Sequence, residues 1–148
     1  MTEVEAFLTP SEESEIVEAI RLAELNTSGE IRVHLEPHCK KDSFVRAEEV
    51  FNKLEMYKTE NRNGVLIYVA VEDHSIVIMG DQGINEKVPD DFWESTINTI
   101  IEHFKNGKPK QGLVEGILKA GEQLKKYFPY QEDDIDELPN TISKGTNE

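Results

Sequence analysis

Hydrophobic residues recur every three or four positions in four segments of the chain, so that each segment has one apolar helical face. The first segment follows Thr9-Pro10-Ser11-Glu12, where Thr9 can cap a helix and Glu12 completes a capping box. We therefore predict four amphipathic helices. They begin after Thr9, after Asp42-Ser43, at Pro89 and at Pro109, and the first ends near Asn26.

Three other segments have the patterns of strands. Residues 31–36 alternate apolar and polar side chains, which is typical of a half-buried strand. Residues 64–71 form a continuous apolar run, which indicates a central strand covered on both faces. Residues 75–79 pair back on this run as a hairpin. We expect a fourth, short strand either in residues 84–88 or in the C-terminal tail.

The predicted order is α-β-α-β-β-α-α. A strand, a helix and a second strand form a right-handed crossover with parallel strands, and the hairpin makes the third strand antiparallel. With helices on both faces, we predict an α/β fold, a three-layer αβα sandwich around a small mixed sheet of three to four strands. The domain is expected to span residues 1–128. Residues 129–148 form an acidic tail that is mobile, or weakly docked through Ile135, Leu138 and Ile142.

Polar turns lie at the three positions that this topology brings to one edge of the sheet. The first two strands begin at that edge and the antiparallel third strand ends there, so residues 27–30, 59–64 and 80–85 converge. Carboxylate and amide oxygens are ligands of hard cations, and this edge therefore predicts a calcium or magnesium site. The candidate ligands are Glu30, Glu60, Asp81, Glu86, Asp90 and Asp91, with amide oxygens from Asn61, Asn63 and Asn85.

These carboxylates also have structural explanations. Asp81 can accept hydrogen bonds from backbone amides of its own turn. Asp90 and Asp91 can stabilise the start of a helix. Glu30 can pair with Arg62. Residues 81–91 do not fit an EF-hand loop, so no specific calcium motif chooses between these explanations and the cation site.

Composition and charge narrow the function further. The chain has 148 residues, 37% of them hydrophobic and 31% charged, which fits one globular domain. The net charge of -14 argues against nucleic acid and against an anionic membrane surface. The tail accounts for -5 of it, and the remaining body is still acidic. Without a long apolar run or a signal-peptide pattern, we expect a cytoplasmic monomer whose partner, if it has one, is a protein.

Other chemistry has weaker support in the sequence. His34, His38 and Cys39 are zinc-ligand types, but they lack a zinc-binding spacing, and an incidental grouping is the simpler explanation. The chain has no GxSxG, GxxxxGK[ST] or GxGxxG motif. A metal-dependent phosphatase that uses the same carboxylates stays open as an alternative. A metal-free interaction module that uses the acidic tail or Tyr127-Phe128-Pro129-Tyr130 also stays open.

The order and spacing of three motifs resemble the TPM domain family over about residues 10–128. The motifs are Asn63-Gly64-Val65-Leu66-Ile67-Tyr68, a hairpin into Gly80-Asp81-Gln82-Gly83, and Phe104-Lys105-Asn106-Gly107 with Gly112-Leu113 and Gly116-Ile117. Thr27-Ser28-Gly29-Glu30 stands where the family has a turn before its first strand. Many members carry a signal peptide and a transmembrane helix, so this chain resembles a stand-alone, soluble bacterial version.

The resemblance implies an αβα sandwich and supports Asp81 and Glu30 as cation ligands, since some members bind calcium. A thylakoid-lumen member is linked to photosystem II repair and reported as an acid phosphatase, and other members modulate membrane receptors. Many relatives have an aromatic residue at the position of Asp81, so their site chemistry need not transfer. We therefore expect a non-enzymatic, calcium- or magnesium-binding TPM domain whose bound ion orders the converging loops for a partner, with the acid phosphatase as the alternative.

Overall fold

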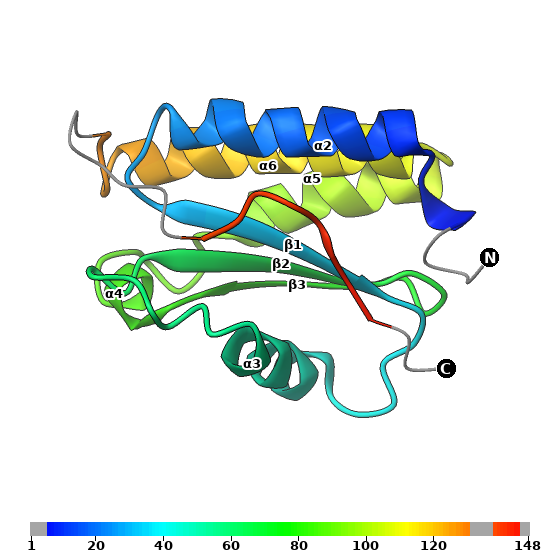
Figure 1. Ribbon diagram of the computed structural model, residues 1–148, viewed down its shortest axis with the longest axis horizontal. Coiled ribbons are helices and arrows are strands. Elements are labelled where there is room, and N and C mark those ends of the chain that lie inside the picture. Colours follow the sequence, from blue (N-terminus) through cyan, green and yellow to red (C-terminus); the bar gives the residue numbers. More distant parts are fainter. Residues whose placement is uncertain (1–5, 131–137, 146–148) are drawn as a thin grey trace.

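The structure is a computed structural model, and it describes residues 6–130 and 138–145. Its helices and strands follow the order expected from the sequence, with additions in the loop after β3 and in the tail (Figure 1). The helices are α2 (Pro10–Glu24), α3 (Ser43–Lys53), α4 (Gln82–Asn85), α5 (Glu94–Lys105) and α6 (Pro109–Lys125). The strands are β1 (Glu30–Glu36), β2 (Gly64–Ala70), β3 (Ser75–Gly80) and β4 (Ser143–Lys144).

The sheet has the strand order β3-β2-β1-β4. β1 and β2 run parallel with Val33 opposite Ile67, and β3 returns antiparallel with Ile78 opposite Ile67. Helices α2, α5 and α6 lie on one side of the sheet and α3 lies on the other (Figure 1). The predicted three-layer αβα sandwich with a mixed sheet is therefore confirmed.

Each face of the sheet has its own core. Val33, Ile67 and Ile78 belong to the larger core, which α2, α5 and α6 complete. Leu66, Tyr68 and Met79 belong to the smaller core, which Ala47, Val50 and Phe51 of α3 complete. Because β2 has apolar side chains toward both cores, its seven residues are all buried, as the continuous apolar run predicts.

β1 is more buried than its alternating pattern predicts. Glu30, His34 and Glu36 are buried although they are polar, so the prediction of a half-buried strand was wrong. The reason is that residues 138–145 run beside β1 (Figure 1). Leu138 is buried in the smaller core, and Gly145 N donates to Leu35 O at 2.8 Å.

The fourth strand lies in the tail and not in residues 84–88. Ser143 and Lys144 pair in parallel with His34 and Leu35 of β1, and Ile142 packs against the larger core. Ile135, which was also expected to help in docking, lies outside the described residues.

Two helix starts show how far local patterns determine boundaries. The capping box of Thr9 and Glu12 is present at α2, as predicted. α5 begins at Glu94 and not at Pro89, because Phe92 N bonds to Pro89 O and Glu94 N bonds to Asp91 O in successive turns. Edge-to-face packing of Phe92 against Trp93, with ring centroids 4.6 Å apart, accompanies these turns. In the described part of the chain, none of the helices has the length and apolarity needed to cross a bilayer.

Candidate functional site

Three loops meet at the end of the sheet where β1 and β2 begin and β3 ends. Glu30 N donates to Asn63 O at 3.1 Å, and Asn63 Nδ2 donates to Ser28 O at 2.8 Å. Gly83 N donates to Arg62 O at 2.9 Å. These bonds tie each loop to the next, so the convergence that the strand directions require is present. We call this region the loop end.

Gly83 allows the closest of these contacts. A Cβ atom at this position would lie 2.2 Å from Asn61 O and 2.6 Å from Arg62 O. Both distances are too short, so any residue with a side chain would clash with these carbonyls. The first turn of α4 can therefore rest against these two carbonyls only because residue 83 is glycine. Backbone carbonyl oxygens are thus concentrated at the loop end beside the polar side chains.

Asp81 is the buried carboxylate on the β3 side of the loop end. Its Oδ1 accepts from Gln82 N at 2.7 Å, which caps α4. Arg62 donates to both of its oxygens, from Nε to Oδ2 at 2.7 Å and from Nη2 to Oδ1 at 2.9 Å. The side chain of Asp81 is 5% exposed, whereas that of Arg62 is 42% exposed. The hydrogen bond to Asp81 raises the pKa of Arg62, so the guanidinium keeps its charge.

This geometry changes the pairing that the sequence suggested. Arg62 pairs with Asp81 and not with Glu30, because Asp81 follows β3, the strand next to β2, and the two loops lie side by side. Glu30 is buried at the other side of the loop end, where its Oε1 accepts from Leu138 N at 2.8 Å. The carboxylate of Glu30 therefore fastens the C-terminal segment to the start of β1.

Asn63 presents an acceptor that has no partner. Its side chain is 3% exposed, and its Nδ2 is used by Ser28 O. Its Oδ1 is buried and has no hydrogen bond to any residue that the structure describes. A buried acceptor without a donor is costly, and a cation or a water molecule satisfies such an atom.

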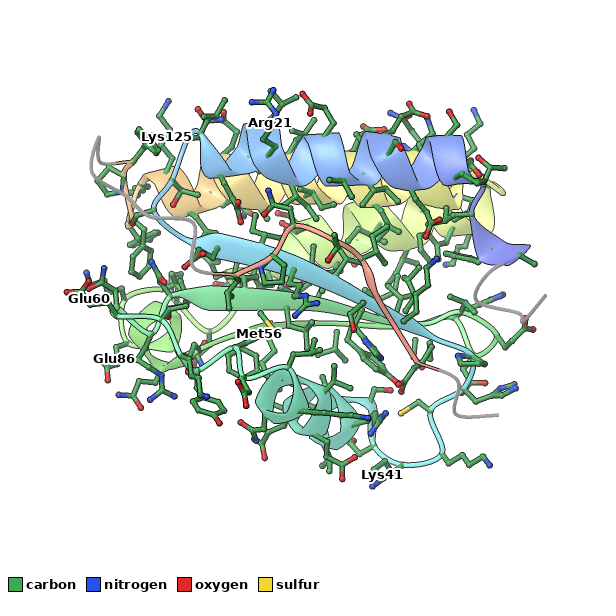
Figure 2. The ribbon with its side chains drawn as sticks, in the orientation of Figure 1. Arg21, Lys41, Met56, Glu60, Glu86 and Lys125 are labelled. Atoms are coloured by element: carbon green, nitrogen blue, oxygen red, sulfur yellow. The ribbon has the colours of Figure 1, made fainter. Side chains whose placement is uncertain are left out.

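The other four candidate carboxylates lie outside this centre. Glu60 and Glu86 are exposed at the outer surface of the loop end (Figure 2). Asp90 and Asp91 are also exposed, and they line a separate groove beside β3. Within residues 6–130 and 138–145, no three side chains of His, Cys, Asp or Glu come together as a metal-binding group. The loop end therefore presents the carboxylate of Asp81 beside uncharged oxygens. The cluster of carboxylates that the sequence suggested is not gathered there.

A small cleft of about 330 Å³ opens at the loop end. Ser28, Asn61 and Gly83 line it from the three loops, and Glu86 contributes the carboxylate at its rim. The ammonium group of Lys87, another lining residue, lies 4.8 Å from the ring centre of Phe128. The cleft therefore has one acid and one base on its walls beside Tyr127, Phe128 and Pro129, and its lining includes neither Asp81 nor Asn63.

A second polar cluster, at the opposite end of the sheet, was missed by the sequence analysis. Glu36 is fully buried and accepts from Arg46 Nε and Nη2, each at 2.9 Å, and from the Tyr68 hydroxyl. His34 Nε2 lies 2.9 Å from Glu36 Oε1, and Ser143 Oγ lies 2.9 Å from His34 Nδ1. The tyrosine inside the apolar run of β2 was the signal for it, because Tyr68 is opposite His34 in the parallel register.

His38 and Cys39 both lie beside Asp73, and among the described residues they form no metal-binding group with a third ligand. His38 Nδ1 lies 3.2 Å from Asp73 Oδ1, and Cys39 N donates to Asp73 Oδ2 at 2.6 Å. His34 is directed instead to Glu36. His38 and Cys39 therefore share Asp73, whereas His34 belongs to the cluster around Glu36.

Comparisons with known proteins agree with this fold. A family model for the TPM domain matches residues 1–123. The NMR structure of BA42 protein from the psychrophilic bacterium Bizionia argentinensis has 63% sequence identity and a TM-score of 0.91, and the match covers 98% of this chain and 100% of that one. The solution NMR structure of the N-terminal domain of a protein from P. gingivalis has 18% identity and a TM-score of 0.70, covering 88% of this chain and 85% of that one, which concerns the fold alone. No curated protein matches the chain.

Proposed function

The chain belongs to the TPM domain family, and within this fold we propose that the loop end binds a divalent cation, calcium or magnesium, through Asp81 and the uncharged oxygens around it. The bound ion takes the place of the Arg62 guanidinium and changes the surface that the three loops present to a protein partner. The function is that of a cation-responsive interaction module.

The observation that carries this proposal is the unequal burial of the Asp81–Arg62 pair. The Asp81 carboxylate is buried, and its cap on α4 fixes its position. The Arg62 guanidinium is half-exposed and reaches the carboxylate from the surface. Because it reaches the pair from solvent, the guanidinium can leave for water when another cation takes its place beside the buried carboxylate. A buried carboxylate whose counterion can leave is suited to exchanging one cation for another.

The remaining oxygens fit a hard cation. Calcium is bound by carboxylate, amide and backbone carbonyl oxygens, and magnesium by one or two carboxylates with retained water. Asn63 Oδ1 is buried without a partner, and the carbonyls of Asn61 and Arg62 are crowded against Gly83. Glu86 lines the neighbouring cleft together with Asn61 and Gly83, and it can contribute a second negative charge from there. With few carboxylates, we expect weak binding, in the range typical of extracellular calcium modules, about 10⁻⁴ to 10⁻³ M.

The test is a calcium and a magnesium titration of metal-stripped protein, followed by amide NMR. We expect saturable shifts confined to residues 28–30, 61–64 and 80–87. Asp81→Asn keeps the oxygen that caps α4 but removes the charge, and it should abolish the shifts while leaving the spectrum folded. Arg62→Gln removes the competing guanidinium and should tighten binding about fivefold. Asp90→Asn, an exposed acid outside the cleft, is the matched control and should bind as the wild type does.

Two results would contradict the proposal. Diffuse shifts that do not saturate would mean that the acidity of the chain attracts ions without a site. Unchanged affinity in Asp81→Asn would remove Asp81 from the site. The phosphatase alternative is tested in the same samples, since turnover of p-nitrophenyl phosphate that requires the ion and is lost in Asp81→Asn would make the site catalytic.

A further inference from the structure

β3 is an edge strand whose outer side is open. Among residues 6–130 and 138–145 it pairs with β2 alone, and the hydrogen bond from Asp81 N to Gly64 O sets the alternation of bonded pairs. Counting from that pair, Met79, Val77 and Ser75 bond to β2. The N–H and C=O groups of Ile76 and Ile78 consequently point away from the sheet. Gly80 O, the next outward group, accepts from Asn85 Nδ2 and is already used.

The sequence of β3 contains none of the features that usually prevent pairing at an exposed edge. Ser75–Gly80 has no charged residue and no proline. Natural proteins commonly place lysine, proline or a bulge on such a strand, since an apolar edge is a template for another strand. The unprotected edge of β3 is therefore suited to accepting a strand.

A groove of about 580 Å³ lies beside this edge. Phe44 from α3 lines one side, and its side chain is 57% exposed. The other side is lined by Trp93, which immediately precedes α5, and by Ile97 of α5. Ile78 and Met79 of β3 also line the groove. The groove therefore combines unpaired backbone groups with apolar walls, which is the arrangement by which sheet edges bind extended peptides.

The rim of the groove is acidic. Asp90, Asp91 and Glu94 are exposed and line the groove, and the whole chain carries a net charge of -14. Pairing of β3 with a second copy would bring two such rims together, and their like charges disfavour it. A segment with lysine or arginine is attracted to the same rim.

We propose that the open edge of β3 binds an extended segment of a partner protein in which apolar residues alternate with lysine or arginine. The segment adds a fifth strand to the sheet through Ile76 and Ile78. Successive side chains of an added strand face opposite sides of the sheet. Its apolar side chains therefore face α3 and lie beside Phe44, and its basic side chains face α5 and meet Asp90, Asp91 and Glu94. This inference is independent of the cation site at the loop end.

The test uses a synthetic peptide, acetyl-Lys-Val-Lys-Val-Lys-Val-Lys-amide, with the full-length protein. The fluorescence of Trp93 reports binding, because it is the only tryptophan of the chain. Amide hydrogen exchange reports strand addition, since the outward N–H groups of Ile76 and Ile78 should become protected. Replacement of the central valine by proline keeps the peptide's charge but breaks the strand, and replacement of lysine by glutamate reverses the charge. Each change should weaken binding by at least about tenfold.

Variants of the protein locate the site. Ile76→Pro removes an outward N–H without removing a bond to β2, and it should reduce peptide binding in a protein that stays folded. Asp90→Asn, Asp91→Asn and Glu94→Gln together should also reduce it. The matched control changes three exposed acids elsewhere, Glu18→Gln, Glu55→Gln and Glu122→Gln, and should leave affinity within about twofold.

Three outcomes would overturn the proposal. Equal binding of the proline peptide would show that charge alone attracts it. Unchanged exchange of Ile76 and Ile78 in the saturated complex would place the peptide elsewhere. Concentration-dependent dimerisation abolished by Ile76→Pro would assign the edge to a second copy of the chain instead of a basic partner.

Discussion

Each end of the sheet holds a buried carboxylate whose two oxygens accept from two nitrogens of one arginine. The two pairs differ in how their arginines are exposed. At one end, Glu36 is 0% exposed and Arg46 is 24% exposed. At the loop end, Asp81 is 5% exposed and Arg62 is 42% exposed. The difference lies in the arginine and in what else surrounds the carboxylate.

Glu36 is held by donors from three elements of the fold. Arg46 of α3 and Tyr68 of β2 donate to it, and His34 of β1 is hydrogen bonded to it. Burial alone would raise the pKa of Glu36, but the hydrogen bonds from His34, Arg46 and Tyr68 outweigh it and hold this pKa far below the ordinary value. Burial and the bond to Glu36 raise the pKa of Tyr68, so its hydroxyl stays a donor.

Asp81 has a backbone amide and one arginine from the surface. The comparison shows that a buried carboxylate becomes structural when its partners come from the interior, and exchangeable when its counterion comes from solvent. The three predictions that follow, together with those attached to the two proposals, test this distinction.

The largest effect is expected at Glu36. Glu36→Ala leaves the Arg46 guanidinium and the Tyr68 hydroxyl without their acceptor, and it should lower the free energy of unfolding by about 3–5 kcal/mol. Urea unfolding followed by circular dichroism measures it. Glu49→Gln is the matched control, because Glu49 also contacts Arg46, at 3.2 Å, but is exposed. A loss no larger than that of the control would show that the Glu36 cluster is not structural.

A pH dependence should accompany this cluster. Because the pKa of Glu36 is lowered in the folded protein, the unfolded chain takes up a proton first as the pH falls below about 4.3. The contribution of Glu36 is therefore complete above that pH and is lost progressively below it. We expect the stability difference between the wild type and Glu36→Gln to shrink from pH 6 to pH 2.5 in urea unfolding. A constant difference over this range would contradict the lowered pKa.

The smallest effect on stability is expected at Arg62. Arg62→Gln should lower the melting temperature of metal-free protein by no more than about 4 °C, because the exposed arginine contributes little. Arg46→Gln, which removes the corresponding arginine at the other end, should lower it more. Equal decreases in the melting temperature of the two variants would show that both arginines are structural. That result would contradict the exchangeable role of Arg62.

Much of the fold followed from local patterns. The capping box at Thr9, the cap at Asp42 and the apolar run of β2 are local signals, and they placed α2, α3 and β2 closely. The start of α5 was misplaced by five residues, from Pro89 to Glu94, because the turns before it depend on how Phe92 packs. Asp81 was expected to supply a turn or a ligand, and its cap on the short helix α4 was not foreseen.

The candidate site was predicted in part. Strand directions alone place the three loops together, since the beginnings of parallel strands and the end of an antiparallel neighbour share an edge. Which carboxylates turn inward depends on side-chain contacts that the pattern does not contain. Asp81 and Glu30 are buried there, whereas Glu60, Glu86, Asp90 and Asp91 are exposed.

The sequence by itself determined most of the secondary structure, the crossover, the excess of acid and the meeting of the loops, because periodicity and chain direction are local properties. The tertiary structure alone decided the partners of the buried charges. Arg62 pairs with Asp81 nineteen residues away, and Glu36 pairs with Tyr68 thirty-two residues away. Such pairs form when packing removes water from a carboxylate and a donor must replace it. The donor that replaces it is the group that the fold has brought nearby.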